Sequence, residues 1–528
     1  TRTLSGGETQ RITLANSLGA SLMDTLYVLD EPTIGLHARD NDRLVSLLEK
    51  LRDAGNTVLV VEHDPAVIRR ADEIVELGPA SGEKGGEVVF QGTVEELLRG
   101  SIPSAADAAS GPGRGSGFDA RGSSGEAEAS GDGTEASDAS DPNSERERAI
   151  ESDGVEARTA TARYLAGEME APESRERPVD GRALRVEGAT LHNLDAVDVT
   201  IPLNTLTVVT GVSGSGKSTL VHDVLFRALE RELEGEHSAK EHLGEAVGTY
   251  ERLEGVGFLD AVALVDQSPI GRTPRSNPAT YTKAFDYIRK IFADQPLSRE
   301  RGYDKGRFSF NTKGGRCEEC KGDGVVEVEM VFMADVYVPC DACGGARYSP
   351  DTLEVKVKGK TIRDVLDMTV DEAIKFFIRE DRLGRTLWQL QQVGLGYLRL
   401  GQAAPTLSGG EAQRMKIARE LARAGKRKGK RLYILDEPTT GLSGPEVHKL
   451  VGVLQKLVDA GHTVVVIEHN LDMVRAADWI IDLGPEAGPG GGEVVVAGRP
   501  REVAGEDASH TGRYLKELLG GGTLAGTR

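Results

Sequence analysis

The sequence predicts an α/β protein with a mainly parallel sheet, present as two tandem copies of which the first is truncated, with an inserted four-cysteine module. Three observations lead to this prediction. Short aliphatic runs alternate with helical patterns along the chain. Five sequence blocks recur in the same order about 400 residues apart. All four cysteines lie between positions 317 and 343.

Composition excludes several classes of protein. The 528 residues give room for two to four domains. Acidic residues outnumber basic ones by 84 to 64, so any contact with a polyanion must come from local patches. The chain has no run of the roughly 18 to 20 apolar residues that a membrane helix needs, and four clustered cysteines do not form a secreted disulfide framework. Because it opens without Met or a signal-peptide pattern, we expect an amino-terminally incomplete, soluble, cytoplasmic protein.

The internal repeat is carried by five pairs of blocks. They are LSGGETQR at 4–11 and LSGGEAQR at 407–414, LYVLDEPT at 26–33 and LYILDEPT at 432–439, VVEH at 60–63 and VIEH at 466–469, ELGP at 76–79 and DLGP at 482–485, and RYL at 163–165 and 513–515. A period this long exceeds the 20 to 50 residues of solenoid repeats, so it indicates a duplicated domain.

The repeat sets the expected domain boundaries. Residues 1–100 form the carboxyl-terminal part of the first copy, and residues 181–528 form the second copy with the cysteine module at about 300–350. Residues 101–180 between them are small, polar and rich in acids. Such a segment cannot bury enough apolar surface to offset its ordering entropy, so we expect a flexible acidic linker. A solvated spacer fits this composition better than an interaction tail.

Individual elements follow from short patterns. Aliphatic and β-branched runs predict buried parallel strands, and longer amphipathic runs predict helices. The predicted strands are 206–210, 432–435 and 463–467, and the predicted helices are 413–424 and 446–457, with a further helical run at 220–229.

A phosphate-binding loop occupies residues 211–218, which read GVSGSGKS. The loop lies between a predicted strand and a predicted helix, which favours a ligand site over a simple glycine-rich turn. Its glycines let backbone N–H groups face phosphates, Lys217 supplies a compact positive charge, and Ser218 can ligate Mg²⁺. The candidate nucleotide-binding residues are Gly211, Gly214, Gly216, Lys217, Ser218 and Thr219.

Polar residues at the ends of predicted strands complete the chemistry. We expect Asp436 to hold Mg²⁺ and Glu437 to polarise the attacking water. His469 is placed to position the γ-phosphate, and Gln267 to contact metal or water. A lone His or Gln of this kind is usually structural, but their order along the chain with the phosphate loop favours a functional interpretation.

A Ser-Gly-Gly run opening a helix makes a second anion nest, because its N–H groups and the helix dipole face outward. Its residues are Ser5, Gly6 and Gly7 in the first copy and Ser408, Gly409 and Gly410 in the second. The chain therefore resembles the ATP-binding cassette (ABC) family, in which two P-loop ATPase domains sandwich ATP, with the phosphate loop of one against the signature of the other.

The resemblance implies two unequal sites. One pairs Lys217, Ser218, Gln267, Asp436, Glu437 and His469 with the signature at 5–7. The other has Asp30, Glu31, His63 and the signature at 408–410 but no phosphate loop, so we expect at most one hydrolytic site. The loop after the second acidic pair reads GLSG at 441–444 where the first copy reads GLHA at 35–38. We expect it to couple the two sites less well.

The cysteines form two C-x₂-C pairs separated by nineteen residues, 321–339. This spacing is typical of a four-thiolate structural Zn²⁺ site made by Cys317, Cys320, Cys340 and Cys343. Bases and aromatics at 307–316 beside it allow a nucleic-acid contact. A zinc knuckle without a partner is an equally good interpretation of these residues alone.

The zinc module between a phosphate loop and an ABC signature resembles the UvrA family, the damage-sensing subunit of the UvrABC excision nuclease. Matching blocks lie at 267–280, 306–316, 337–340 and 484–493. We interpret the chain as the carboxyl-terminal portion of such a protein. The alternatives are the ATPase of an ABC transporter and a drug-resistance relative.

The resemblance to UvrA implies an ATPase that binds lesion-bearing double-stranded DNA, usually as a homodimer. It would load the UvrB partner, while UvrC would make the incision. The same resemblance makes Arg307, Lys313 and Arg316 candidate DNA contacts.

Overall fold

The structure is a computed structural model that describes residues 23–79, 82, 85–100, 158–169, 171–234, 248–271, 273–328, 336–424 and 429–520. Its centre is a six-stranded sheet with the order β15-β14-β7-β13-β12-β9. The strands are β7 (Leu206–Gly211), β9 (Ala261–Val265), β12 (Arg431–Asp436), β13 (Thr463–Ile467), β14 (Trp479–Gly484) and β15 (Glu493–Gly498). Neighbours pair in parallel except β15, which is antiparallel to β14. The predicted α/β class is confirmed.

Both faces of this sheet are covered, because its strands are aliphatic at successive positions. Val208 packs into the core on one face and Val209 into the core on the other. The covering helices are η3 (Thr219–Phe226), α7 (Arg227–Glu234), α15 (Gly409–Ala424) and α16 (Gly444–Asp459). All the strands and helices predicted for this copy are present, although η3 is a π-helix where an α-helix was expected. An antiparallel sheet of β5 (Ala183–Leu191), β6 (Leu194–Pro202) and β8 (Arg252–Glu254) shares the core with η3.

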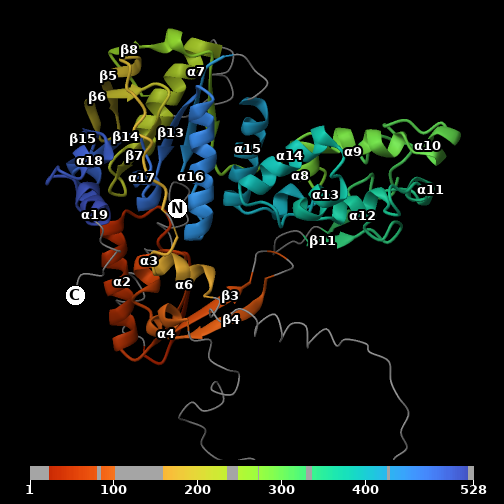
Figure 1. The fold of residues 1–528 in the computed structure, drawn as a ribbon, viewed down its shortest axis with the longest axis horizontal. Helices are drawn as coiled ribbons and strands as arrows, with labels where there is room; N and C mark the ends of the chain where they lie inside the picture. Colours follow the sequence, from red (N-terminus) through yellow and green to blue (C-terminus); the bar gives the residue numbers. More distant parts are fainter. Residues whose placement is uncertain are drawn as a thin grey trace, which may run out of the picture.

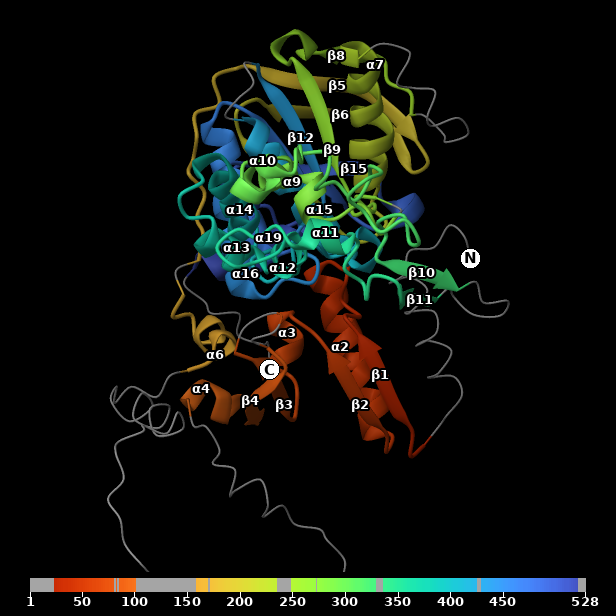
Figure 2. The same cartoon turned by 90° about the vertical axis from the view of Figure 1, so that its right-hand side faces the viewer.

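A largely helical region lies to one side of the sheet (Figure 1). It contains α8 (Pro278–Tyr281), α9 (Ala284–Ala293), α10 (Pro296–Glu300), α11 (Pro350–Leu353), α12 (Ile362–Asp367), α13 (Val370–Phe376) and α14 (Asp381–Gln392). The hairpin of β10 (Val325–Val328) and β11 (Val336–Pro339) projects from it on the side that faces the viewer's right in Figure 2.

The first copy lies below the second in Figure 1 and is drawn in red to orange. It has two separate strand pairs, β1 (Leu26–Asp30) with β2 (Thr57–Val61), and β3 (Ile74–Gly78) with β4 (Glu87–Gly92). Strands β1, β2, β3 and β4 correspond in this order to β12, β13, β14 and β15 of the second copy. In the second copy β7 lies between β13 and β14, whereas no strand among the described residues lies between β2 and β3. The helices of the first copy are α2 (Ala38–Asp53), α3 (Pro65–Ile68) and α4 (Val94–Arg99).

The last helix of each copy corresponds to the repeated RYL block. These helices are α6 (Ala160–Leu165) and α19 (His510–Leu519), and α17 (Leu471–Arg475) and α18 (Pro500–Val503) precede α19. Helix α6 falls inside the range 101–180 predicted as a linker. It is ordered because Ala162 and Leu165 are buried against Phe90 and Leu97 of the first copy. Residues 101–157 lie outside the described residues. Within the described part of the chain, no helix has the length and apolar character needed to cross a bilayer.

Candidate active site

The phosphate loop follows β7 and leads into η3, as its pattern predicts. Gly211 has a φ of 129°, and a Cβ there would lie 1.9 Å from the carbonyl oxygen of Leu483, so only glycine fits. The buried Lys217 donates from Nζ to the carbonyl oxygens of Gly211 (3.0 Å) and Val212 (2.8 Å). The loop is therefore held closely against β14.

Electrostatics around Lys217 match a phosphate-binding role. Burial lowers the pKa of Lys217 to about 8, and the carboxylates of Glu437, Asp482 and Asp436 oppose that shift. An anionic ligand would act in the same direction as these carboxylates and stabilise the ammonium form.

The acidic pair lies at the carboxyl end of β12, which is separated in the sheet by β13 from β7, the strand that leads into the phosphate loop. Burial raises the pKa of Asp436, and the nearby His222 and Lys217 oppose this shift. His222 Nε2 lies 3.6 Å from Asp436 Oδ2. Glu437 adopts a φ of 43° and its counterpart Glu31 a φ of 42°, in a region that non-glycine residues seldom occupy. Both copies therefore hold the second carboxylate in the same strained backbone conformation.

His469 lies beside Glu437, with 3.9 Å between its Nε2 and Glu437 Oε1. Burial, reinforced by Lys217, lowers the pKa of His469 well below its ordinary value, so the imidazole is neutral. Glu468, which sequence reasoning did not single out, fixes this loop by accepting from the N–H groups of Thr439 (2.8 Å) and His469 (2.8 Å). Its position in the repeated VIEH block was the available signal.

Gln267 and the second signature lie together at the start of α15. The Gln267 amide donates to Thr440 Oγ1 at 3.4 Å, and a Cβ at Gly409 would lie 3.2 Å from Gln267 Oε1. Ser408 caps the helix by accepting from the Glu411 N–H at 3.2 Å. The signature side thus presents helical N–H groups, as its sequence predicts.

Gln413 is a further residue that sequence reasoning missed. It is buried and donates from Nε2 to the carbonyl oxygens of Val265 (3.0 Å) and Asp436 (2.6 Å). This side chain joins the signature helix to the ends of β9 and β12. Its position in the repeated block at 407–414 was the available signal, since the first copy has Gln10 at the matching position.

A cavity of about 170 Å³ separates the acidic pairs of the two copies. Each copy contributes a loop glycine to the opposite acidic pair. A Cβ at Gly35 would lie 3.2 Å from Glu437 Oε1, and one at Gly441 would lie 3.5 Å from Glu31 Oε1. The two loops therefore cross the interface to similar depth, although their sequences differ. The signature residues Ser5, Gly6 and Gly7 lie outside the described residues, so their pairing with Lys217 stays a prediction.

The first copy repeats part of this arrangement. Asp30 ends β1, and His63 Nε2 lies 3.7 Å from Glu31 Oε1. Glu62 accepts from the Thr33 N–H at 2.9 Å, as Glu468 does in the second copy. The His63 side chain is 43% exposed, whereas His469 is only 8% exposed. The histidine of the first copy is thus more exposed than its counterpart, whereas the two glutamates are similarly exposed, at 24% and 28%.

The four cysteines converge at the base of the β10–β11 hairpin. Their sulfur atoms all lie within 4.8 Å of one another, and Cys320 Sγ is 3.7 Å from Cys343 Sγ. A tetrahedral Zn²⁺ with bonds of about 2.3 Å needs sulfurs about 3.8 Å apart, so the donor set fits. Gly324 N–H donates to Cys320 Sγ at 3.3 Å. Burial raises the pKa of Cys320 to about 12, so a bound cation is needed to hold the thiolate at neutral pH.

Comparisons with known proteins agree with this combination of features. No family model matches the sequence. UvrABC system protein A of Aquifex aeolicus is 50% identical over 523 residues, which cover 99% of this chain and 50% of the relative. The protein of that name from Thermus thermophilus is 51% identical over 517 residues, covering 98% and 47%. By sequence, nearly the whole chain is similar to part of the proteins named UvrABC system protein A. It spans about half the length of the curated relatives it matches.

The fold shows the same similarity. A crystal structure of UvrA2 from Deinococcus radiodurans matches with a TM-score of 0.79 and 44% identity, covering 98% of this chain and 55% of that chain. The match therefore includes both copies, the acidic pairs and the cysteine module.

The three candidate DNA contacts differ in accessibility. Arg307 stacks over Tyr303 at 4.4 Å and donates to Thr352 Oγ1 at 3.0 Å. Arg316 is mostly buried and donates to the Asn311 carbonyl oxygen at 3.3 Å. Lys313 is exposed. The two arginines thus make internal contacts that shape the module, while the lysine faces solvent.

Proposed function

We propose that this chain is an ATPase that recognises damaged DNA in nucleotide excision repair. The observation that carries the proposal is the match to UvrABC system protein A at about 50% identity over 98% or more of the chain. That match extends over the phosphate loop, both acidic pairs and the cysteine module together.

The residues around Lys217 fit ATP and Mg²⁺ by their chemistry. A phosphate loop, a strand-end Asp and a neighbouring hydroxyl form the donor set that P-loop ATPases use. Ser218 and Asp436 would hold Mg²⁺, which when bound neutralises charge on the phosphate oxygens. Lys217 binds the phosphates, while Glu437 accepts a hydrogen bond from the attacking water and orients it. The neutral His469 beside Glu437 positions the γ-phosphate. We assign hydrolysis to this site alone.

The cysteine module fits a structural Zn²⁺ because its four thiolates leave no open coordination position. The Cys320–Cys343 sulfur separation of 3.7 Å is close to that of a tetrahedral site. The metal would fix the base of the β10–β11 hairpin. Lys313, which is exposed near the module, would then contact the backbone of duplex DNA.

Lesions unstack and soften DNA, so a rigid protein surface can detect damage through deformability rather than through base edges. ATP binding between the copies would change the geometry of that surface. By analogy with the family, we propose that the chain acts in the cytoplasm as a homodimer, loads UvrB onto lesion-bearing duplex, and leaves incision to UvrC.

The experiment compares binding of a duplex carrying one bulky adduct with binding of the same intact duplex, at about 150 mM salt. The wild-type chain and Lys217→Ala are each measured with ATP, with ADP and without nucleotide. We expect a preference for the adduct that changes with nucleotide in the wild type but not in the variant. Equal affinity for both duplexes in every nucleotide state would contradict the repair function and favour a transporter or drug-resistance ATPase.

A further inference from the structure

His37 of the first copy lies inside the candidate active site of the second. It follows the loop glycine that approaches Glu437 and is 1% exposed. Its ring lies 6.1 Å from the ring of His469, centroid to centroid, at an interplanar angle of 88°. This edge-to-face geometry is the favoured contact between two rings in a buried environment.

Hydrogen bonds hold His37 from the opposite side. Its Nδ1 accepts from the Arg39 N–H at 3.2 Å, which leaves the ring proton on Nε2. That Nε2 lies 3.0 Å from Thr511 Oγ1 on α19 and donates to it. The Thr511 hydroxyl in turn donates to Asp482 Oδ1 at 3.1 Å. A side chain of one copy is thus anchored to a carboxylate of the other through a single hydroxyl.

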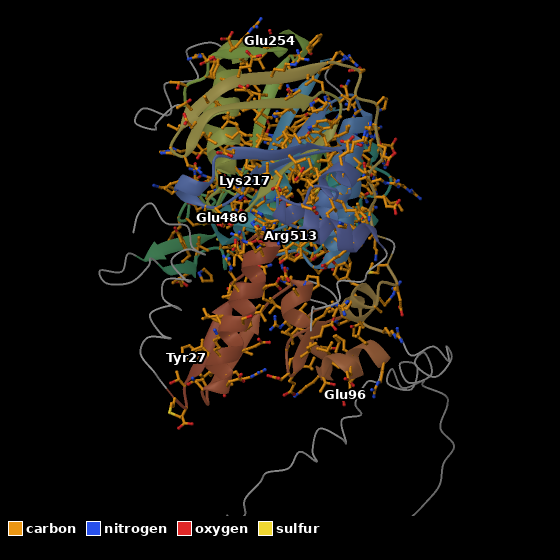
Figure 3. All side chains as sticks on the ribbon, turned by 90° about the vertical axis from the view of Figure 1, so that its left-hand side faces the viewer. Tyr27, Glu96, Lys217, Glu254, Glu486 and Arg513 are labelled. Atoms are coloured by element: carbon orange, nitrogen blue, oxygen red, sulfur yellow. The ribbon has the colours of Figure 1, made fainter. Side chains whose placement is uncertain are left out.

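Asp482 connects this anchor to the phosphate loop. It lies on β14, directly opposite Thr210 of β7, one residue before the loop begins. Ser509 Oγ also donates to Asp482, at 2.5 Å, so both carboxylate oxygens are occupied. The anchor is therefore rigid, and its position is set by the same two strands that set the phosphate loop. In Figure 3, Lys217, Glu486 and Arg513 lie in the part of the second copy that adjoins the first, and Tyr27 and Glu96 lie far from it.

The other copy lacks an equivalent contact at the matching position. Ser443 stands where the first loop has His37, and its hydroxyl donates to Glu446 of its own helix at 2.7 Å. Consistent with this difference, His63 is much more exposed than His469. In the second-copy site, His469 thus packs against a residue of the first copy.

We propose that His37 is a positioning residue for ATP hydrolysis in the second copy: held by Thr511 and Asp482, it packs against His469 and fixes that imidazole beside Glu437. This proposal rests on the ATPase function proposed above. The same hydrogen bonds join the interface between the copies to β14.

The test measures ATP turnover and equilibrium ATP binding by the full chain carrying His37→Ser, the residue found at the matching position of the other copy. Because the phosphate loop is untouched, we expect KM and the dissociation constant for ATP to change by less than about twofold. We expect kcat to fall about tenfold, because the His469–Glu437 geometry is loosened.

Two further variants distinguish the loss of His37 positioning from a nonspecific loss of structure. Thr511→Val removes the hydroxyl and should lower kcat similarly, and combining it with His37→Ser should add little, because both remove the same anchor. Thr161→Val changes the matching residue of α6 and serves as the control, with kcat expected to be unchanged. If His37→Ser does not fold, Thr511→Val carries the same expectation against this control.

The outcomes distinguish the two proposals. A wild-type chain without ATP turnover overturns both the ATPase function and the role of His37. Turnover that survives unchanged in His37→Ser or Thr511→Val overturns only the positioning role. The same holds for a loss that appears in KM rather than in kcat, or for fully additive losses in the double variant.

Discussion

The two copies contain nearly the same strand, LYVLD at 26–30 and LYILD at 432–436, yet they bury it differently. Leu26 is 59% exposed, whereas Leu432 is fully buried at 0%. In the second copy β7 completes the sheet, and η3 packs on the face that contains Leu432. Local sequence is therefore enough to form the strand, but burial depends on the elements that pack against it.

The active-site residues show the same contrast. His469 is 8% exposed and packs against His37, whereas His63 is 43% exposed. The carboxylates Glu437 and Glu31 are similarly exposed, at 28% and 24%. The same residue types are thus present twice, and the two sites differ mainly in how far the histidine is shielded from solvent.

The largest expected effect is a difference in ATP turnover between variants of the two acidic pairs. Glu437→Gln should lower ATP turnover about 100-fold or more, because the group that orients the water loses its charge. Glu31→Gln, the matching change in the first copy, should leave turnover within about twofold. Steady-state ATPase assays check this, with ATP affinity measured to show that both variants still bind. Similar losses in the two variants would show that both sites hydrolyse.

A second comparison uses the identical leucines. Leu432→Ala should destabilise the second copy by about 2–5 kcal/mol, because it leaves a cavity in a packed core. Leu26→Ala removes an exposed side chain and should cost less than about 0.5 kcal/mol. The urea midpoint of far-UV circular dichroism, to which the helices of both copies contribute, measures the stability of both variants. Equal shifts would mean that Leu26 is also covered in solution.

Metal removal should affect the second copy locally. Chelation, or Cys340→Ser, should expose the backbone amides of the β10–β11 hairpin to hydrogen exchange, because the four thiolates would no longer share a cation. The six-stranded sheet and the first copy should keep their protection, since their cores do not include the cysteines. Global loss of protection would show that the module supports the whole fold.

The smallest expected effect concerns pH and the helix caps Asp64 and Asn470, which occupy matching positions. Burial raises the pKa of Asp64 to about 6, above the value of about 4 expected in the unfolded chain. Between these values the folded state holds a proton that the unfolded state has lost, so stability falls as pH rises from 4 to 6. Asp64→Asn, which copies the second cap, should remove this dependence.

Hydrogen exchange of α3 and its neighbours across this pH range, corrected for the intrinsic rate, measures the effect. An unchanged pH dependence in Asp64→Asn would assign the effect to another group.

Much of the fold was predictable from sequence because it is encoded in local patterns. The strand before the phosphate loop consists of aliphatic and β-branched residues at 206–210, and the two C-x₂-C pairs fix the sulfur geometry by their spacing. Contacts between the copies were not predictable. Nothing in the sequence near His37 indicates that Thr511, 474 positions away, receives its hydrogen bond. The same applies to Gln413, whose partners are carbonyl oxygens on two strands.

Helix α6 shows why composition alone misplaced one boundary. The residues around it are mostly small and polar, like the rest of 101–180. However, the apolar side chains of Ala162 and Leu165 pack into a core of the first copy. Tyr164 also donates to Asp472 of the second copy at 2.9 Å. The repeated RYL block was the better guide here, because it marked a packed element rather than an average composition.

The most direct test of the account is the number of ATP molecules that one chain binds and hydrolyses. Equilibrium binding with labelled ATP, measured on the wild type and on Lys217→Ala, gives that number. We predict one high-affinity ATP per chain, and its loss together with all turnover in Lys217→Ala. Two ATP molecules bound with similar affinity, or turnover that persists in Lys217→Ala, would contradict the central claim that only the second copy forms a hydrolytic site.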